Sequence, residues 1–420
     1  MKKFLTLLSL TILWQQPCLA NYAYVTHTGN NRISVIDTDT NNVVDSIALE
    51  SGSSCQYAAV TPDGSYLYVS CLGTGKVHVI NTDTNIIETT ILGFNEPLGI
   101  AFDPDGSFAY VADMSDNNIS VIDTQTRTIA TTIAIGHIPS TVAITPYGHY
   151  AYATNIADNN VSIIDITSNN VIVGTIQTGV GPFGIVMLPS GQYVYVSNSQ
   201  DNTVSVIATA TNNVIATISV GAAPLYLWAS PDGASVYVPN AFSNTLSVIN
   251  TATQTVSATI ALPDGGIPYK VATLASNNHA YVTDNGGRVF VINMATNEVI
   301  DTISVPDGCV GITIAPALSP RSPVSLSCYE TKNYFLTQTD TINVLTWQAA
   351  SSGMEASHYL IYRDNLSNLI GQVPASGPLI FYDHNRRLDI PVIYYVKAVS
   401  ETDTESFAPA ITFHGASSPL

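Results

Sequence analysis

Cysteine and histidine have the most reactive side chains in this 420-residue chain. Beyond position 20 there are four cysteines, Cys55, Cys71, Cys309 and Cys328, and His27 lies near the start of the same region. Paired thiols form disulfides in an oxidising compartment, whereas thiolates and imidazole together bind soft metal ions. The spacing matches no zinc-finger pattern. The chemistry therefore depends on how the fold brings these residues together.

Carboxylates are a second possible source of chemistry. Glu96 directly precedes Pro97, and His137 lies two residues before Pro139. A carboxylate and an imidazole within reach of one another could act as general acid and base. Several aspartates could bind Ca²⁺. We favour instead the usual role of Asp in turns, which is to bond to nearby backbone. These aspartates are Asp113, Asp116, Asp158, Asp201 and Asp284.

Motifs for other chemistries are missing from the sequence. There is no Gly-x-Ser-x-Gly, His-Glu-x-x-His, Cys-x-x-Cys-His or phosphate-binding loop. Haem attachment and nucleotide binding are therefore not expected.

A repeat of about 42 residues positions all of these side chains. Its anchors are seven tyrosines spaced 44, 42, 42, 43, 42 and 44 residues apart, namely Tyr24, Tyr68, Tyr110, Tyr152, Tyr195, Tyr237 and Tyr281. Self-similarity at this period is typical of a propeller or a solenoid. A solenoid needs polar capping repeats, and neither end has one, which favours a closed ring.

One repeat contains four short strands. Residues 181–220, for example, hold four runs rich in Val, Ile, Tyr and Thr, separated by turn residues. The first turn is of the Pro-Asp-Gly type, as at 62–64, where Pro presets φ and Gly supplies positive φ. Four antiparallel strands make one blade, so the sequence predicts an all-β, seven-bladed propeller.

The two ends of the repeat region supply one blade between them. The chain after position 20 begins with a second-strand pattern at 22–27, and the matching first strand occurs only at 310–315. We therefore expect the strand Val310–Ala315 to join the N-terminal blade and close the ring. Closure removes an exposed sheet edge that would otherwise template aggregation.

This alignment also places the cysteines. Cys55 and Cys309 occupy a position that holds proline in the other five repeats. Counting back from the turn at 63–64 puts Cys71 opposite Cys55 or the residue after it. We expect a Cys55–Cys71 disulfide, which leaves Cys309 and Cys328 to tether the C-terminal region. Four cysteines allow three connectivities, so the others stay open.

A soft-metal site is the alternative for the same residues. Ring closure brings Cys55, Cys71, Cys309 and His27 onto one rim of the central channel, where thiolates and an imidazole could act as ligands.

Two tetrapeptides at the anchor tyrosines resemble a known pattern. Residues 195–198, Tyr-Val-Ser-Asn, and 237–240, Tyr-Val-Pro-Asn, are similar to the Tyr-Val-Thr-Asn repeat of the YVTN family of seven-bladed propellers. The resemblance spans about 295 residues and all seven repeats. It implies the propeller fold. The family includes surface-layer proteins, periplasmic binding proteins and relatives of redox-enzyme propellers, so fold alone does not decide function.

The Asn of this pattern ends the second strand on the channel rim. Four repeats depart from Asn there and carry His27, Cys71, Asp113 and Asp284. We predict that a ligand or partner binds at this rim. The predicted rim residues are His27, Asp113, Asp116, Asn155, Asp158, Asn198, Asp201, Asn240 and Asp284.

The first 20 residues have the form of a secretory signal peptide. Lys2 and Lys3 precede the mostly apolar run 4–13, and residues 18–20 have a small-x-small ending. Cleavage after Ala20 would place the protein in the periplasm, outside the cell or on the surface of a bacterium. A lipid anchor on Cys18 is the alternative, although the residues before it make a poor lipobox. No later stretch reaches 18 apolar residues, so an integral membrane protein is not expected.

The charge balance is acidic. The net charge is −18, and residues 21–317 hold 22 acidic but only 5 basic residues. This balance argues against nucleic acid as a partner. We expect a monomer that binds a protein, peptide or glycan of the cell envelope and needs no cofactor.

The repeat stops before a Pro- and Ser-rich segment at 318–323. Residues 324–420 then resemble a fibronectin type III module, a β-sandwich with Trp347 in an early strand, Tyr362 in the next and Tyr394 or Tyr395 near the tyrosine corner. The predicted organisation is a signal peptide at 1–20, a propeller at 21–317, a linker at 318–323 and this module at 324–420.

Together these features favour an exported, non-enzymatic binding or scaffold protein. An alternative is a propeller-type lyase or lactonase, because Glu96 and His137 at the channel mouth are similar in type to the acid and base of such enzymes. A second alternative is a metal-handling protein that uses the cysteines and His27.

Overall fold

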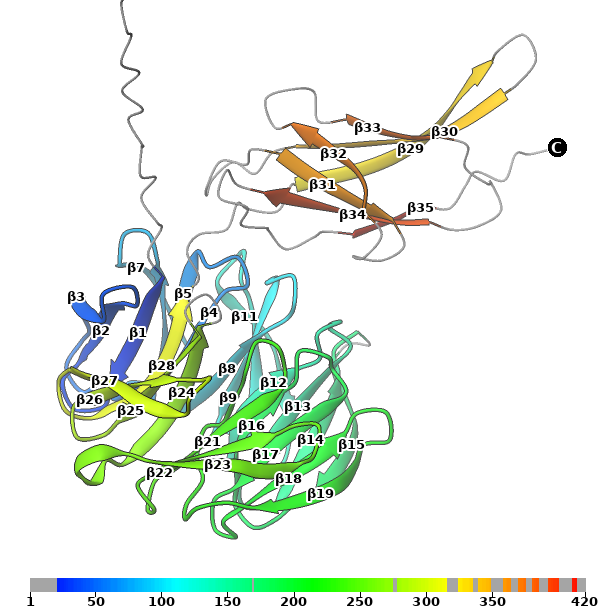
Figure 1. Cartoon of the computed structure of the whole chain (residues 1–420). Coiled ribbons are helices and arrows are strands. Elements are labelled where there is room, and N and C mark those ends of the chain that lie inside the picture. Colours follow the sequence, from blue (N-terminus) through cyan, green and yellow to red (C-terminus); the bar gives the residue numbers. More distant parts are fainter. Residues whose placement is uncertain are drawn as a thin grey trace, which may run out of the picture.

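The computed structural model describes residues 21–167, 170–274 and 278–315, followed by seven strands between 324 and 413. The first three segments form seven four-stranded antiparallel sheets, which are the blades of the predicted propeller (Figure 1). The all-β fold class is confirmed. Among the described residues there is one short 3₁₀ turn, Pro263–Gly265, and no helix long and apolar enough to cross a membrane.

The strands of each blade follow one another in sequence, except in blade 1. Blade 1 contains β28 (Cys309–Ala315), β1 (Tyr22–His27), β2 (Arg32–Asp37) and β3 (Asn42–Ala48). Blades 2 and 3 contain β4 (Cys55–Val60), β5 (Tyr66–Cys71), β6 (Lys76–Asn81) and β7 (Ile86–Leu92), then β8 (Pro97–Phe102), β9 (Phe108–Asp113), β10 (Asn118–Asp123) and β11 (Thr128–Ala134). Blades 4 and 5 contain β12 (Pro139–Ile144), β13 (Tyr150–Asn155), β14 (Asn160–Asp165) and β15 (Val171–Gln177), then β16 (Pro182–Met187), β17 (Tyr193–Asn198), β18 (Thr203–Ala208) and β19 (Asn213–Ser219). Blades 6 and 7 contain β20 (Trp228–Ala229), β21 (Ser235–Asn240), β22 (Thr245–Asn250) and β23 (Thr255–Ala261), then β24 (Pro268–Leu274), β25 (His279–Asp284), β26 (Arg288–Asn293) and β27 (Glu298–Ser304).

The ring closes as the sequence predicts. In Figure 1 the yellow β28 lies beside the blue β1, and the two pair antiparallel from Tyr22↔Ala315 to His27↔Cys309. The edge that an open ring would expose is therefore paired within the chain.

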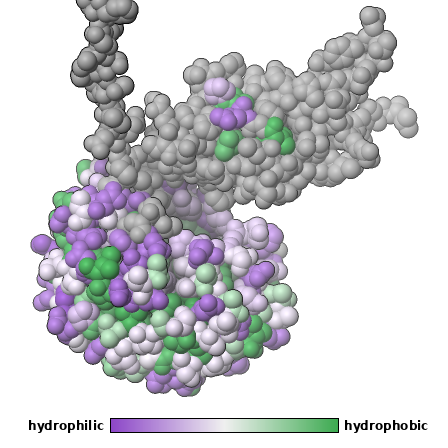
Figure 2. All heavy atoms as spheres, viewed as in Figure 1, coloured by the Kyte–Doolittle hydropathy of each residue, from purple (hydrophilic) through white to green (hydrophobic). Residues whose placement is uncertain are grey.

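The core of the described propeller lies between blades. Seven clusters of buried apolar residues occur there, and each combines residues of two neighbouring blades. The second and third strands supply most of these residues, because their β-branched and aromatic side chains are buried on both faces. On the propeller face seen in Figure 2, hydrophilic and hydrophobic residues are interspersed.

The anchor tyrosines connect neighbouring blades through their hydroxyls. Tyr152 donates to Asn212 Oδ1 of the next blade at 2.7 Å. Asn212 has a φ of 53°, a left-handed conformation that Asn adopts more readily than most residues. Equivalent bonds run from Tyr24, Tyr110 and Tyr281 to Asn85, Asn170 and Asn41.

Within the described residues, this bond is missing in three blades. Asn297 follows the blade that carries Tyr237, but its Oδ1 has no hydrogen-bond partner. Gln254 replaces the Asn after the blade that carries Tyr195, and the Tyr195 hydroxyl is buried without a hydrogen-bond partner. Arg127 replaces it after the blade that carries Tyr68, and no bond of this kind is present there within the described residues.

Seven strands follow the propeller segments and pair into two antiparallel sheets. One has the order β29 (Val324–Tyr334), β30 (Thr339–Gln348) and β33 (Ile380–His384). The other has the order β32 (Leu369–Pro374), β31 (His358–Arg363), β34 (Val392–Val399) and β35 (Ala410–Phe413). The resemblance to a fibronectin type III module stays a prediction, since the side chains of Trp347, Tyr362, Tyr394 and Tyr395 lie outside the described residues.

The tyrosine bonds predict a difference between two otherwise similar substitutions. Tyr152→Phe removes a buried hydroxyl that has a partner and should lower the free energy of unfolding by about 1 kcal/mol. Tyr195→Phe removes a buried hydroxyl that has none and should leave the free energy unchanged or higher. Urea unfolding at pH 7 measures both. Equal losses in the two variants would contradict the proposed role of the Asn partner.

Candidate functional site

Most of the predicted rim residues are buried in hydrogen bonds within their own blade. Asn198 is fully buried, and its Nδ2 donates to Thr203 Oγ1 at 3.0 Å and Ser205 Oγ at 2.9 Å on the third strand. Asn155 and Asn240 make the corresponding pairs of bonds. These amides fix the end of the second strand to its neighbour.

The two aspartates at this position bind the loop that enters the first strand. Asp113 accepts the backbone N–H groups of Asn95 and Glu96, each at 2.9 Å, and burial raises the pKa of its carboxyl. Asp284 accepts a backbone N–H of the equivalent loop and the Nε–H of Arg288 at 2.6 Å. Both carboxylates are almost fully buried.

The three loop aspartates also bond to their own surroundings. Asp158 accepts the backbone N–H of His137 at 2.8 Å, and Asp201 accepts that of Val180 at 2.6 Å. Asp116 Oδ1 accepts a hydrogen bond from the side-chain Nδ2 of Asn95 at 3.1 Å. Among the described residues there is no group of three or more His, Cys, Asp and Glu arranged to hold a metal ion.

The cysteines confirm one part of the prediction and correct another. Cys55 and Cys71 are direct partners in the β4–β5 register and form a disulfide. Cys309 is a buried free thiol that donates to the carbonyl of Asp284 at 2.7 Å, so the expected tether from Cys309 to Cys328 is not formed. The Cys328 side chain lies outside the described residues.

The predicted soft-metal ligands are close together but differ in chemistry from a metal site. His27 lies opposite Cys309 in the β1–β28 register. Its Nε2 is bonded to Ser34 Oγ at 2.9 Å, and burial lowers its pKa to about 4. Burial raises the pKa of the Cys309 thiol to about 11. With Cys55 and Cys71 oxidised, no thiolate is available from them, so this set does not favour a metal.

Glu96 and His137, the predicted acid–base pair, are each held by a different residue. Glu96 accepts the hydroxyl of Ser115 at 2.6 Å. His137 is paired with Asp158 at 3.0 Å and its side chain is 70% exposed. Both residues are described, and no ion pair or hydrogen bond joins them.

A site that the sequence did not indicate lies in the central channel. The channel is lined by the inner strands, β4, β8, β12, β16, β24 and β28, and by residues 224–229 of blade 6. We call the third residue of each the channel waist. The waist residues are Tyr57, Gly99, Thr141, Gly184, Tyr226, Lys270 and Gly311. In every blade except blade 6, the pairing between the first and second strands shifts register next to this residue.

Lys270 is the charged residue of the waist. It is 2% exposed, its Nζ lies 3.2 Å from the centre of the Tyr57 ring, and it donates to the carbonyl of Ala58 at 3.2 Å. The side chain reaches from blade 7 to blade 2, past β28. Gly311 permits this close packing, because a Cβ there would lie 2.5 Å from the carbonyl oxygen of Gln56.

Two effects act on the Lys270 amine in opposite directions. The face of the Tyr57 ring favours the charged ammonium. Burial away from water favours the neutral amine, and no carboxylate of the described residues forms an ion pair with it. A buried ion costs several kcal/mol, more than the roughly 2 kcal/mol of a desolvated cation–π contact. Burial therefore holds the pKa of Lys270 well below its usual value.

Aromatic rings complete the waist. The ring centre of Tyr226 lies 5.6 Å from that of Tyr57 and 4.9 Å from that of Phe183, both in edge-to-face geometry. The Tyr226 hydroxyl is buried without a hydrogen-bond partner. Burial raises the pKa of Tyr57 to about 12, so its phenol is neutral.

A cavity of about 340 Å³ extends from the waist toward the Pro-Asp-Gly turns. We call it the channel cavity. Its walls are mainly apolar side chains from the inner strands, among them Val60, Phe102, Ile144, Met187 and Trp228, and Lys270 also lines it. Trp228 is fixed by a bond from its Nε1 to Thr273 Oγ1 at 3.1 Å. An apolar cavity with a few polar groups is the usual form of a small-molecule site.

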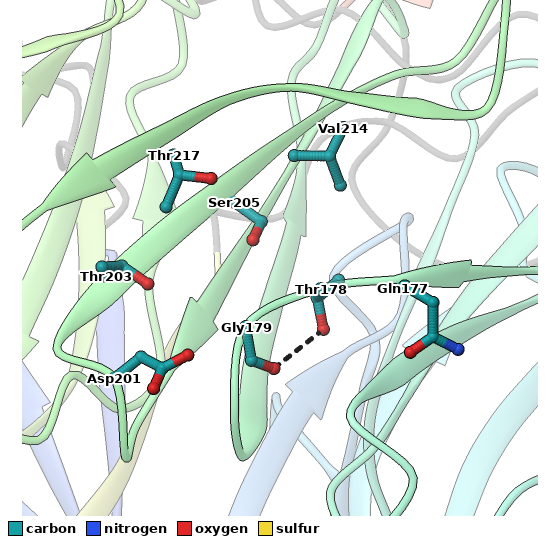
Figure 3. A pocket seen from close by; sticks show the side chains of 8 residues that line it. All are labelled: Gln177, Thr178, Gly179, Asp201, Thr203, Ser205, Val214 and Thr217. Carbon is teal, nitrogen blue, oxygen red and sulfur yellow. Dashed lines mark hydrogen bonds between the residues drawn. The ribbon is translucent and has the colours of Figure 1, made fainter.

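A second kind of hollow follows the repeat itself. A hollow of about 350 Å³ lies next to β18, and Thr203, Ser205, Thr217, Gly179 and Asp201 are among the residues that line it (Figure 3). A similar hollow of about 400 Å³ occurs one repeat later, with Thr245, Ser247 and Thr259 in the matching places. Because it recurs with the repeat, we attribute it to blade architecture rather than to a specific site.

Comparison with known proteins supports the fold. A family model described as a lactonase-type seven-bladed β-propeller matches residues 24–213, and a model of YNCE-like β-propellers matches residues 185–294. Each match covers less than half of the chain. No curated protein matches it. The YVTN resemblance stays a prediction.

Similar solved structures are distant in sequence. A functionally unknown protein from Desulfotomaculum acetoxidans aligns with a TM-score of 0.62 at 20% identity, over 70% of this chain and 99% of its own. Kuenenia stuttgartiensis hydrazine synthase aligns with a TM-score of 0.58 at 21% identity, over 72% and 97%. Dihydro-heme d1 dehydrogenase NirN aligns with a TM-score of 0.55 at 13% identity, over 87% and 75%. At these identities the likeness shows the fold alone.

The disulfide assignment predicts a labelling pattern. In denaturant without reductant, iodoacetamide should modify Cys309 and leave Cys55 and Cys71 unmodified, as read by peptide mass spectrometry. Reducing the bond, whose cysteines are 16 residues apart, should lower the free energy of unfolding by about 3 kcal/mol. Modification of Cys55 and Cys71 before reduction would contradict the assignment.

The buried amine predicts a pH dependence of stability. Because the pKa of Lys270 is lowered in the folded state, the unfolded chain binds more protons at any pH between that pKa and about 10.5. The free energy of unfolding should therefore rise with pH across this window. Lys270→Met keeps the volume but removes the titration.

Urea unfolding of both proteins at pH 7, 8 and 9 tests this. The slope of the wild-type protein should exceed that of Lys270→Met by up to about 1.4 kcal/mol per pH unit. Parallel dependences on pH would show that the Lys270 pKa is not lowered.

Proposed function

We propose that this chain is an exported, non-enzymatic binding protein whose ligand occupies the channel cavity. The carrying observation is that the cavity breaks the repeat. Tyr57, Tyr226 and Lys270 fill the waist at positions where three other blades have glycine, and Trp228 stands where blades 2, 3, 4 and 7 have alanine. In a fold of near-identical units, such departures are where function is expected.

The state of the rim residues also favours the cavity. The Asn amide nitrogens and Asp carboxylates that end the second strands bond to their own blades or loops, and these side chains are almost fully buried, so few of them are accessible to a ligand. The channel cavity instead presents apolar walls, and its volume of about 340 Å³ lies near the lower end of the range for small-molecule sites.

The expected ligand is small and mostly apolar. It can be a free molecule or an apolar group carried by a protein or peptide of the cell envelope. Export is supported by the signal-like sequence at 1–20, which lies outside the described residues, and by the disulfide, since such bonds persist in oxidising compartments.

Filling the cavity should abolish binding. Ala101 lines the cavity at the position that holds Trp228 in blade 6, so Ala101→Trp introduces a side chain that the fold already accepts there. We expect calorimetry with 4-phenylbutan-1-ol to show one site in the wild-type protein and at least tenfold weaker binding in this variant.

A matched control adds the same ring outside the channel. Val44 lies on the outermost strand of blade 1 and is 52% exposed, and Val44→Trp should bind the alcohol as the wild-type protein does. Equal binding by all three proteins would place the site elsewhere, and no binding by the wild-type protein would reject the proposed function.

A lactonase or lyase is the second candidate, favoured by the family-model match at residues 24–213. Glu96 and His137 would then have to come together from their separate partners. Hydrolysis of a panel of aliphatic lactones, lost in Glu96→Gln with an unchanged circular dichroism spectrum, would establish it. Turnover that Glu96→Gln retains would exclude this pair.

A further inference from the structure

We propose that Lys270 binds a carbonyl ligand covalently, as an imine, at the floor of the channel cavity. This inference rests on the proposed function, because it names the chemical class of the ligand. The geometry that carries it is a primary amine that is 2% exposed, lines an apolar cavity and pairs with no carboxylate in the part of the chain that the structure describes.

The position of the amine is set by three elements. Its backbone belongs to β24, its Nζ lies over the ring of Tyr57 on β4, and Gly311 of β28 lets these strands approach. The stem is therefore held across the channel, with the nitrogen over the Tyr57 ring and bonded to the Ala58 carbonyl. Nothing in this arrangement requires the lysine for the repeat, since other blades have glycine or threonine at the same place.

The surroundings favour a nucleophilic amine. A lysine desolvated by an apolar pocket is deprotonated more easily, and the neutral form has the lone pair that attacks a carbonyl. Nearby carboxylates would favour the protonated amine, but Glu50, Asp264 and Asp284 pair with Lys76 or Arg288.

The reaction balances without any further reagent. The Nζ lone pair adds to the carbonyl carbon of an aldehyde and forms a carbinolamine. The carbonyl oxygen then leaves as water with the two hydrogens of the amine, and a C=N bond to Nζ remains. No electron is transferred, and hydrolysis by water reverses the step. The ligand is thus held by a reversible bond within an apolar cavity.

A neutral carbonyl fits better than a carboxylate. A carboxylate would need Lys270 protonated, which burial opposes. It would also have to approach a region with 22 acidic and 5 basic residues, which repels anions. An uncharged aldehyde with an apolar chain meets neither barrier. Its chain would contact the same cavity walls as the chain of the alcohol.

One polar group at the waist has no partner. The hydroxyl of Tyr226 is buried without a hydrogen-bond partner, and its ring packs edge-to-face on the Tyr57 ring that carries Nζ. A buried hydroxyl without a partner lowers stability. Such a group is expected where a ligand brings its own polar atom.

Reductive trapping tests the imine. The full-length mature chain is incubated at pH 7 with 4-phenylbutanal and sodium cyanoborohydride, which reduces an imine to a stable secondary amine. We expect one adduct per chain, mapped by peptide mass spectrometry to Lys270, forming at least tenfold faster than at Lys76. Labelling of Lys270 no faster than of Lys76 would overturn the proposal.

The alcohol and the carboxylate with the same phenylbutyl chain distinguish failure of the imine from failure of the proposed function. Lys270→Met should lose the adduct, whereas Val44→Trp, outside the channel, should still form it and still bind 4-phenylbutan-1-ol. If the wild-type protein binds the alcohol but gives no adduct, the imine is wrong and the binding function stands. If it binds neither, the proposed function fails as well. Tighter binding of 4-phenylbutyrate than of the alcohol, with proton uptake, would make Lys270 an ion-pair partner and overturn the imine.

Discussion

The antiparallel pairing of β28 with β1 is the contact on which the rest of the structure depends. Each blade buries its apolar residues only against its two neighbours, so a ring that stayed open would expose a core face on blades 1 and 7. The same seam carries the bond from Tyr281 to Asn41 and the reach of Lys270 from blade 7 to blade 2. Ring closure therefore also assembles the channel waist.

The repeat determines what the sequence could predict. The tyrosine spacing predicted seven blades, and the displaced first strand predicted closure by residues 310–315, because both are patterns of strand order and side-chain alternation. The register of β4 and β5 followed from the length of one hairpin, which is why Cys55–Cys71 could be predicted. Each of these features is local, or repeats with the blade.

The predictions that did not hold involve contacts between blades or over longer distances. Cys309 and Cys328 lie in different units, so no hairpin length constrains their separation, and Cys309 is bonded to backbone carbonyls instead. The sequence showed Lys270 only as one of five basic residues of the repeat region. It could not show that the side chain enters the channel, because that depends on the register shift next to the waist. The role of the rim Asn had an overlooked signal, a Thr or Asn five residues later and a Ser seven residues later, in blades 4, 5 and 6.

A repeat fold separates architecture from function more clearly than most folds do. The hydroxyl-lined hollows recur because the blades recur, and they need no ligand to explain them. Lys270 has the opposite character, since burying it without an acid lowers stability and three other blades have glycine at the same position. Seven interblade clusters can offset one such cost. A residue that the fold tolerates but does not need is best explained by a molecule that fills the channel.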